Sequence, residues 1–558
     1  MAVSTFNIYN ASAGSGKTFT LVKDYLKIVL SSKEFLPHRH VLAITFTNKA
    51  VDEMKTRIIE ALMAFASPTI LDHPDALFTQ VVKELQSTPD VIHVKSKHLL
   101  SKVLHNYAAF DISTIDKFTQ KIIRTFAFDL KLPMNFEVEL DTDHLLQKAV
   151  SRLLSKAGKN KTLTKVLVDF ALEKADDDKS WNIALDLAKT AKLLTKETEA
   201  PFLHGLSQHS LSDFEALKKS LIKEIFEAET QIVTVANQVL ELILSSGLEF
   251  SDFSRGSLPK HFKALASKKF DLSFSAQWQQ SIDTTPLYTQ KTPPDVASVI
   301  DGLHPQLIEA FQATKTTFYR LKYLNNIRKN TTPLSVINLI NKELKIIKEE
   351  DNLLFISEFN TIISQEIKDQ PAPFIYERIG EKFNHFFIDE FQDTSELQWE
   401  NLVPLVTNSL AAENGSTMLV GDAKQAIYRW RGGRAEQFIS LYNNDSDLPF
   451  DAELSYLPTN YRSCREIVGF NNRFFKHLST VVFSNQTYKD LYQAPAQLEF
   501  NNKAGYVNIS FLEFEKGDDK PLIYATKVLQ IINTYLDSDP DTKLKDICVL
   551  VRKRKEGV

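Results

Sequence analysis

The sequence predicts an α/β fold with a phosphate-binding loop near its amino terminus and a large all-helical segment in its middle. Three observations predict this organisation. A strand–loop–helix signature occupies residues 6–32, an apolar run at 386–388 ends in two carboxylates, and helical periodicity runs through most of 129–351. The 558 residues are too many for a single hydrophobic core and indicate several domains.

The composition fits a globular protein in a reducing compartment. Hydrophobic residues make up 43% and charged residues 24% of the chain, and 38 Phe against 16 Gly suggests aromatic-rich helical cores. The two cysteines cannot form a disulfide framework, and neither a signal peptide nor an uninterrupted apolar run of about 18 residues is visible. We therefore expect a cytoplasmic location without a membrane partner. The net charge of −4 neither favours nor excludes a local basic groove for nucleic acid.

The first element is the loop "NASAGSGKTFT" at 10–20, which follows the strand-like "FNIY" and opens a helix. Gly14 and Gly16 allow backbone N–H groups to approach phosphate oxygens, and the helix N-terminus favours negative charge. Lys17 would reach the β- and γ-phosphates of a nucleotide, and the Thr18 hydroxyl would hold Mg²⁺. The alternative is a chance Gly/Ser turn before a helix.

The loop departs from the pattern G-x-x-x-x-G-K-[ST] at its first position, where Ala11 replaces glycine. This position needs a small residue more than it needs glycine, so we expect the phosphate site to be retained. The residues expected to bind the nucleotide phosphates are Ala11, Ser12, Ala13, Gly14, Ser15, Gly16, Lys17 and Thr18.

The second element is the acidic partner in "FNHFFIDEFQDTSELQWENL" at 383–402. Residues 386–388 suit a buried strand, which places Asp389 and Glu390 at its carboxyl end, where open α/β sheets bind ligands. Asp389 would hold Mg²⁺ and Glu390 would polarise the attacking water. The alternative is a solvated charge cluster in which residues 393–395 cap the next helix.

Six segments in order resemble the motor motifs of UvrD/Rep-type superfamily 1 DNA helicases. They are "ASAGSGKT", "AITFTNKAVDEMKTRI" (43–58), "ISTIDKFTQ" (112–120), "IDEFQDTSELQ" (388–398), "LVGDAKQAIYRWRGG" (419–433) and "LPTNYRSCREIV" (457–468). The opening "ASAG" and the long gap between the third and fourth segments look most like the RecB/AddA branch, whose members are helicase subunits of helicase–nuclease complexes. The six segments comprise 71 of the 558 residues, and six in order is a specific signal.

The resemblance implies a RecA-like P-loop NTPase motor that uses ATP and Mg²⁺. Gln425 matches a position that senses the γ-phosphate, and Tyr461 matches a residue that stacks on adenine. Arg462 matches an arginine that stabilises charge in the transition state. The implied catalytic residues are therefore Lys17, Asp389, Glu390, Gln425 and Arg462.

The resemblance also implies residues that contact DNA: Phe46, Asn48, Thr114 and Trp430. Trp430 would stack on a base of a single strand. Without the flanking motif, Tyr428 and Trp430 would be read as core aromatics. The alternative for Arg431 is a surface ion pair, and that for 50–58 is a helix with Val51, Met54 and Ile58 on its buried face. Asp116 stands where relatives carry histidine, so no DNA contact is assigned to it.

The resemblance and the helical pattern together divide the chain. We expect a first RecA-like domain at 1–128 and 352–455, a helical insertion at 129–351, and a hinge motif with the start of a second RecA-like domain at 456–558. Strands are expected at 505–515 and 545–553, with a helix at 521–536 between them. The family's last motor motifs and a nuclease domain do not occur within the 558 residues, which indicates the N-terminal part of a longer protein.

Two stretches of the helical segment are basic, and each is either a solvated helix face or a surface for duplex DNA. They comprise Arg152, Lys156, Lys159, Lys161 and Lys165, and Arg255, Lys260, Lys263, Lys268 and Lys269.

The function expected is ATP-driven translocation on single-stranded DNA, in repair or recombination at DNA ends. The family resemblance implies 3′-to-5′ travel and, as a partner, the second protein of a helicase–nuclease complex. Three alternatives stay open: an ATP-binding scaffold or ATPase subunit that is inactive alone, an ATP-dependent nuclease subunit, and action on RNA, since base stacking does not read the 2′-OH.

Overall fold

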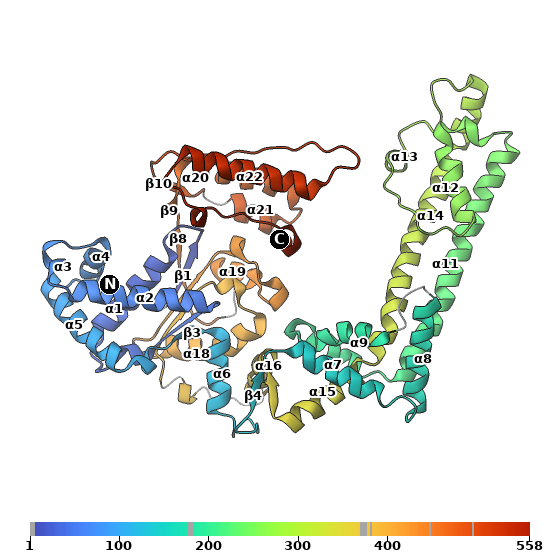
Figure 1. The fold of residues 1–558 in the computed structure, drawn as a ribbon. Helices are drawn as coiled ribbons and strands as arrows, with labels where there is room; N and C mark the ends of the chain where they lie inside the picture. Colours follow the sequence, from blue (N-terminus) through green and yellow to red (C-terminus); the bar gives the residue numbers. More distant parts are fainter. Residues whose placement is uncertain are drawn as a thin grey trace. The chain divides into compact units, whose positions relative to one another are not determined.

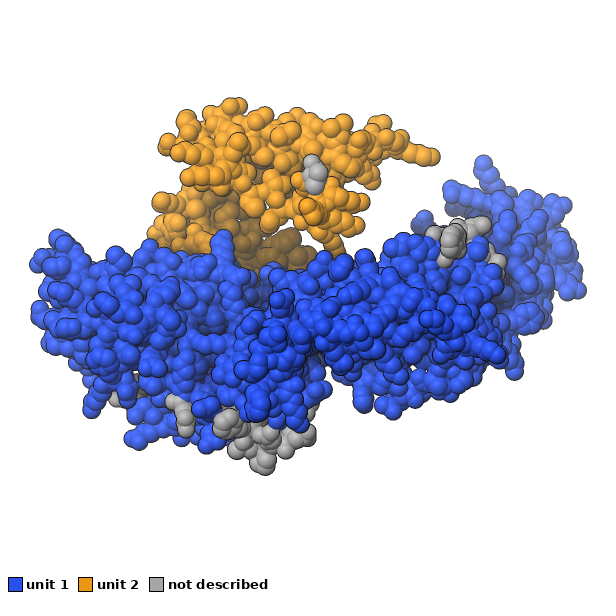
Figure 2. Space-filling view, turned by 60° about the horizontal axis from the view of Figure 1, so that its bottom comes forward, with its two compact units in different colours: residues 1–457 blue, residues 458–558 orange. Residues whose placement is uncertain are grey.

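The computed structural model describes residues 6–176, 182–368, 377–379, 382–445, 448–493 and 496–557. Residues 177–181 of the predicted helical segment lie outside this set. The chain divides into two compact units, Met1–Leu457 and Pro458–Val558, which are coloured separately in Figure 2.

Unit 1 is built on a six-stranded sheet in which every neighbouring pair is parallel. Its strands, in spatial order, are β3 (Ile112–Thr114), β2 (Val41–Thr45), β6 (His385–Ile388), β7 (Ser416–Gly421), β1 (Phe6–Ala11) and β8 (Glu453–Leu457). In β1, Ile8 lies between Leu419 of β7 and Leu454 of β8. The predicted strands before the loop and before the acidic pair are therefore both present, as an α/β fold requires.

Helices cover both faces of this sheet (Figure 1). One face packs against α1 (Lys17–Ser31), α2 (Asn48–Ala66), α3 (Thr69–Asp72), α4 (Ala76–Glu84) and α5 (Pro89–His105). The other packs against α6 (Ile115–Thr125), α16 (Ile356–Lys368), α18 (Glu396–Ala411) and α19 (Ala435–Tyr442). The run "VLAIT" of β2 is buried throughout, as expected for a parallel strand with both faces covered.

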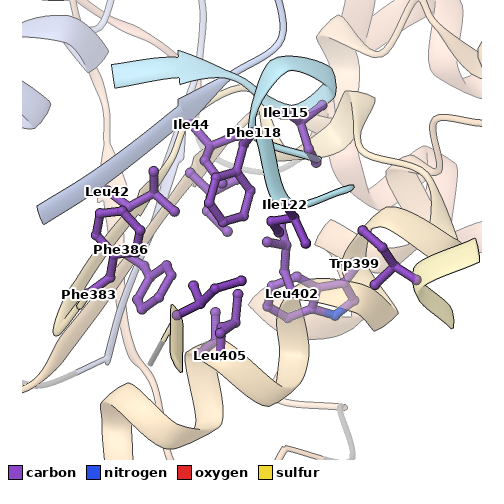
Figure 3. Packing of buried hydrophobic residues seen from close by; sticks show 14 of the residues in the cluster. Leu42, Ile44, Ile115, Phe118, Ile122, Phe383, Phe386, Trp399, Leu402 and Leu405 are labelled. Carbon is purple, nitrogen blue, oxygen red and sulfur yellow. The ribbon is translucent and has the colours of Figure 1, made fainter. Parts of the chain in front are cut away.

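Alternate residues of the strands point to opposite faces of the sheet and belong to two separate hydrophobic cores. Leu42 and Ile44 belong to one hydrophobic cluster, whereas Val41 and Ala43 belong to the other. Figure 3 shows part of the first cluster, where side chains of β2 and the segment before and within β6 meet those of α6 and α18. The labelled side chains are Leu42, Ile44, Ile115, Phe118, Ile122, Phe383, Phe386, Trp399, Leu402 and Leu405.

Between β4 (Glu137–Glu139) and β5 (Leu353–Phe355), which pair in parallel, the described residues form only helices and turns. The α-helices are α7 (Thr142–Leu154), α8 (Lys161–Asp176), α9 (Ile183–Ala191), α10 (Ala200–Ser207), α11 (Leu211–Ser245), α12 (Ser257–Ala266), α13 (Gln277–Gln280), α14 (Pro294–Ser335) and α15 (Ile337–Asp351). The long helices α11 and α14 run side by side and share a buried core with α12 (Figure 1). A second core joins α7, α8, α9 and α15.

Unit 2 contains β9 (Thr459–Cys464) and β10 (Leu498–Asn501), which pair in parallel, with α20 (Arg465–Val482), α21 (Gln486–Gln493) and α22 (Lys520–Ser538). The helix predicted at 521–536 is α22. The strands predicted at 505–515 and 545–553 are wrong, because these residues belong to no strand. Alternating hydrophobicity suits a strand, but a strand also needs a hydrogen-bonded neighbour, and neither segment has one among the residues described in this unit.

Candidate functional site

The carboxyl ends of the parallel strands bring the motif segments to one edge of the sheet. The spatial order of the strands sets the order of the loops along that edge. The phosphate loop follows β1, the acidic pair follows β6, and the segment with Gln425 follows β7, which lies between them. Phe46 directly follows β2, and Thr114 is the last residue of β3. Both of these strands lie on the other side of β6. The edge therefore divides into a β6–β7–β1 part and a β2–β3 part.

The phosphate loop has the backbone that its glycines permit. Gly14 and Gly16 adopt φ of 77° and 87°, a left-handed region that favours glycine. Gly16 is the N-cap of α1, and no described side chain caps that helix end, which leaves its first N–H groups open to an anion. The Ser15 hydroxyl is buried without a hydrogen-bond partner in the part of the chain that the structure describes. Open amides and an unpartnered hydroxyl are what a phosphate group would satisfy.

The replacement of glycine by Ala11 has a packing explanation. Ala11 is fully buried, pairs with Leu457 of β8, and lies in the same hydrophobic cluster as Leu21 of α1. A methyl group therefore fills space in the core at the point where β1 ends. The alanine is compatible with the turn that follows it.

Lys17 and Glu390 are brought together from positions 373 residues apart in the sequence. The Lys17 ammonium donates to both carboxylate oxygens of Glu390, at 2.8 and 3.0 Å. Glu390 has φ 52° and ψ 43°, a left-handed conformation that costs a residue with a side chain roughly 1–2 kcal/mol. Backbone strain of this kind is concentrated at functional sites.

Asp389 lies beside this pair and is held by the backbone. Its N–H donates to the carbonyl of Ile44 at 2.9 Å, and its Oδ1 accepts from the Glu390 N–H at 3.0 Å. Burial, and then repulsion from the Glu390 carboxylate, raise the pKa of Asp389 to about 7, although Lys17 opposes the shift. A divalent cation would favour the charged form of this carboxylate, so Asp389 and the hydroxyl of Thr18, the second residue of α1, are suitable ligands for Mg²⁺.

A buried glutamine, which the sequence reasoning missed, connects the acidic pair to the segment after β7. The side-chain amide of Gln392 donates to Glu390 Oε2 at 2.7 Å, and its oxygen accepts from the Asp422 N–H at 2.9 Å. Asp422 in turn accepts from the Gln425 side chain at 2.7 Å. Gly421 makes room for this network, since a Cβ there would lie 2.9 Å from Gln392 Oε1. Hydrogen bonds therefore connect Gln425 to Glu390 through Asp422 and Gln392.

The helix-cap interpretation of the "DTS" segment is also correct. Ser395 caps α18, and its hydroxyl and the Gln398 side chain form a capping box. Asp393 accepts from the Ile427 N–H at 3.3 Å, and burial is the main reason that its pKa is raised to about 6. Gly433 approaches the Asp393 carbonyl so closely that a Cβ would lie 2.8 Å from its oxygen. The segment 427–433 is therefore anchored directly to the residues that follow the acidic pair.

Aromatic side chains gather at the β2–β3 part of the edge. The rings of Phe46 and Tyr428 lie 4.3 Å apart between centroids, and those of Tyr428 and Trp430 lie 6.3 Å apart. Trp430 is 72% exposed, so it is no core aromatic. Arg431 places its guanidinium 5.1 Å from the centroid of Phe46 and forms an ion pair with Asp116, which confirms the surface ion-pair interpretation.

The other candidate DNA contacts differ in their setting. Asn48 is exposed at the start of α2, whose buried face includes Val51, Met54 and Ile58 as the helix interpretation predicted. Thr114 is buried, and its hydroxyl caps α6 by accepting from the Lys117 N–H at 3.3 Å. The structure thus gives Thr114 a structural role, and its DNA contact stays a prediction.

Tyr461 and Arg462 lie on β9 in unit 2, whereas the residues described above belong to unit 1. Tyr461 is 54% exposed and its ring lies 4.7 Å from that of Phe500 between centroids. Arg462 is exposed, and its backbone N–H donates to Asn460 Oδ1 at 3.0 Å. Their predicted contacts with adenine and the γ-phosphate stay predictions.

The first basic stretch of the helical segment is largely ion-paired. Arg152 binds Glu350 at 2.8 Å, Lys156 pairs with Glu343, and Lys165 binds Glu215 at 2.7 Å. These pairs favour the solvated helix face over a surface for duplex DNA.

The sequence of the chain matches the family model of the UvrD/REP helicase N-terminal domain over residues 3–445. This match covers most of the chain and contains the phosphate loop, the acidic pair and the exposed tryptophan. The chain belongs to the UvrD/REP helicase family. Within the described residues of this family member, no helix is long and apolar enough to cross a membrane.

Curated relatives of this UvrD/REP helicase family member share its sequence at low identity. An ATP-dependent helicase/nuclease subunit of Lactococcus lactis subsp. cremoris (strain SK11) is 25% identical over 527 residues, which cover 86% of this chain and 40% of the relative. The protein of the same name from Lactobacillus johnsonii is 27% identical over 528 residues, with the same coverage. That of Exiguobacterium sibiricum is 23% identical over 600 residues, covering 99% of this chain and 46% of the relative. The chain thus spans less than half the length of these relatives.

Proposed function

We propose that the protein is an ATP-dependent translocase and helicase that acts on single-stranded DNA. The observation that carries this proposal is the division of one sheet edge. Lys17 and Glu390 meet at its β6–β7–β1 part, while the exposed Trp430 and the half-buried Phe46 gather at its β2–β3 part. The hydrogen bonds of Gln392 with Glu390 and Asp422, and the anchored segment 427–433, connect the two parts. Through these contacts, the bound nucleotide would affect the residues that contact DNA.

The residues present fit ATP and Mg²⁺. The N–H groups of residues 11–18 and the Lys17 ammonium would hold the phosphates, with the buried Ser15 hydroxyl among the groups that gain a partner. Thr18 and Asp389 would hold Mg²⁺, which supplies neutralisation of phosphate charge. Glu390 would orient and polarise the attacking water, and Gln425 would sense the γ-phosphate.

Single-stranded DNA would lie along the aromatic cluster. A base stacked on Trp430 contributes roughly 1–3 kcal/mol regardless of sequence, which suits a protein that moves along any strand. Phe46, Asn48 and Thr114 complete the proposed contacts, and 3′-to-5′ travel is proposed from the family resemblance alone.

Residues 129–351 are proposed as a helical insertion in the first RecA-like domain, and residues 456–558 as the start of a second. Tyr461 is proposed to contact adenine and Arg462 the γ-phosphate. The relatives are named as subunits of a helicase/nuclease, which supports a second protein of such a complex as the partner and a role at DNA breaks. The two cysteines are free thiols, which supports a cytoplasmic location.

The test is a Glu390→Gln variant of the protein. The amide keeps the shape of the side chain but can no longer polarise water, so we expect ATP binding to persist while turnover stimulated by single-stranded DNA is lost. Fluorescent-nucleotide titration measures the first quantity and phosphate release the second. Glu413→Gln, at an exposed position in the turn before β7, is the matched control and should behave as the wild type.

Normal turnover by Glu390→Gln would refute the catalytic assignment. ATP and DNA binding by the wild type without any turnover would instead favour the alternative of an ATP-binding scaffold.

A further inference from the structure

The ion pair between Asp116 and Arg431 lies at the part of the edge proposed to bind DNA. Asp116 is the second residue of α6, two positions after the cap residue Thr114, and Arg431 lies in the aromatic segment 315 residues further along. The Arg431 Nη2 donates to Asp116 Oδ2 at 3.0 Å, and the Gln398 amide donates to the other carboxylate oxygen at 3.3 Å. Both ends of the Asp116 carboxylate are therefore occupied and its orientation is fixed.

Arg431 is held on two sides but not enclosed. Its guanidinium lies 5.1 Å from the Phe46 centroid, while 42% of its side chain remains exposed. The guanidinium carries five N–H groups and uses one nitrogen, Nη2, to bind Asp116, so it keeps the capacity to donate to a phosphate. Its position beside Phe46 and close to Trp430 places this cation next to the proposed path of the bases.

Two further carboxylates, Glu197 and Glu400, lie near Asp116. Glu197, from the turn before α10, accepts from the hydroxyl of Ser395 at 2.6 Å. Burial raises the pKa of Glu197, and repulsion from Asp116 and Glu400 adds to the shift, which places these carboxylates within electrostatic reach of one another. A DNA phosphate that approaches Arg431 therefore meets a cation whose charge is already balanced by Asp116.

We propose that Asp116 is an affinity-limiting residue for single-stranded DNA. It competes with the DNA phosphate for Arg431 and lowers the net attraction of this part of the edge. The inference rests on the proposed function, and it assigns a role to a position that the family pattern left without one. A moderate affinity for the phosphate favours release of the strand between translocation steps.

The variant that tests the inference is Asp116→Asn. Asparagine keeps the volume of the side chain and an oxygen that accepts from Gln398, but it removes the negative charge. We expect single-stranded DNA to bind about 3- to 10-fold more tightly at about 50 mM salt, with the gain shrinking as salt screens the exposed charges. The slope of log affinity against log salt should steepen by up to about 0.7, the value for one additional phosphate contact on a single strand.

The measurement is fluorescence anisotropy of a labelled oligothymidylate with the full chain, over a salt series. Arg431→Ala should weaken binding, and adding Asp116→Asn to Arg431→Ala should produce no gain, because the competition needs both partners. Glu396→Gln is the matched control: it removes the same charge from an exposed ion pair with Arg434, also at 3.0 Å, and should leave affinity and slope unchanged. Asp116→Ser serves as a second variant, with Tm measured for each protein.

Two results would overturn the inference. If Asp116→Asn and Asp116→Ser weaken binding as Arg431→Ala does, then Asp116 orients Arg431 for the phosphate rather than competing with it. If they gain affinity equally in the Arg431→Ala background, the effect does not pass through Arg431. In both cases the wild type still binds DNA, so the proposed function stands. If the wild type binds no DNA at any salt concentration, the proposed function and this inference are both overturned.

Discussion

Asp389 is held in a setting that destabilises the folded protein at alkaline pH, and Asp389→Asn should relieve the cost. Its pKa is raised to about 7 in the folded state, chiefly by burial and then by repulsion from Glu390, against an ordinary value of 3.8. The folded protein therefore binds this proton more tightly than the unfolded chain does. The resulting stability is complete below about pH 4 and is lost as the pH rises through 7.

The magnitude follows from the shift. A difference of about 3 pKa units corresponds to about 4 kcal/mol at pH 8, and this is an upper bound because the side chain keeps some contact with water. Unit 1 spans 457 residues, so its unfolding entropy is about 1 kcal/mol per degree. Asp389→Asn should therefore raise the Tm at pH 8 by up to roughly 4 °C.

The assay is thermal unfolding of the wild type and Asp389→Asn between pH 4 and pH 8.5. The difference between their Tm values should be small at pH 4, should grow up to about pH 7 and should then level off, since asparagine has no proton to lose. Asp72→Asn removes the same charge from an exposed position and should show no such trend. A difference that stays constant with pH, or a variant that is less stable at pH 8, would refute the account of the Asp389 environment.

Two further substitutions separate binding from packing. Trp430→Ala should weaken binding of single-stranded DNA by about 5- to 150-fold, the equivalent of one lost base stack. Its Tm should be nearly unchanged because Trp430 is 72% exposed. Unchanged affinity in an anisotropy titration would rule out the stacking role. Gly421→Ala should lower the free energy of unfolding by about 1–3 kcal/mol and reduce ATP turnover, because the new methyl would lie 2.9 Å from Gln392 Oε1. A variant with the Tm and turnover of the wild type would show that Gln392 can move without loss of its function.

Local signals in the sequence predicted much of the nucleotide side of the site. The order strand, glycine loop, helix predicted β1 and α1, and the apolar run before Asp389 predicted β6. Parallel strands present their carboxyl ends at one edge, so these two predictions were enough to place Lys17 near Glu390. The structure adds the direct contact between them.

The missed features depend on long-range packing. The pairing of β1 between β7 and β8 joins segments more than 400 residues apart, and no local pattern specifies it. Gln392 is polar and lies in an acidic stretch, so only its burial in the folded structure identifies it as a bridge. The partner of Asp116 was likewise not predictable, although its departure from the family's histidine was a signal that the position differs.

One edge of the sheet is proposed to bind nucleotide at its β6–β7–β1 part and a DNA strand at its β2–β3 part. Hydrogen–deuterium exchange of the chain, with Mg²⁺–ATP and with oligothymidylate added separately, measures both kinds of binding at the amides concerned. ATP should slow exchange at the amides of residues 11–18, and oligothymidylate should slow exchange at residues 46–48 and 427–431. Protection by ATP that spares residues 11–18, or protection by DNA that spares both of the other segments, would contradict the account.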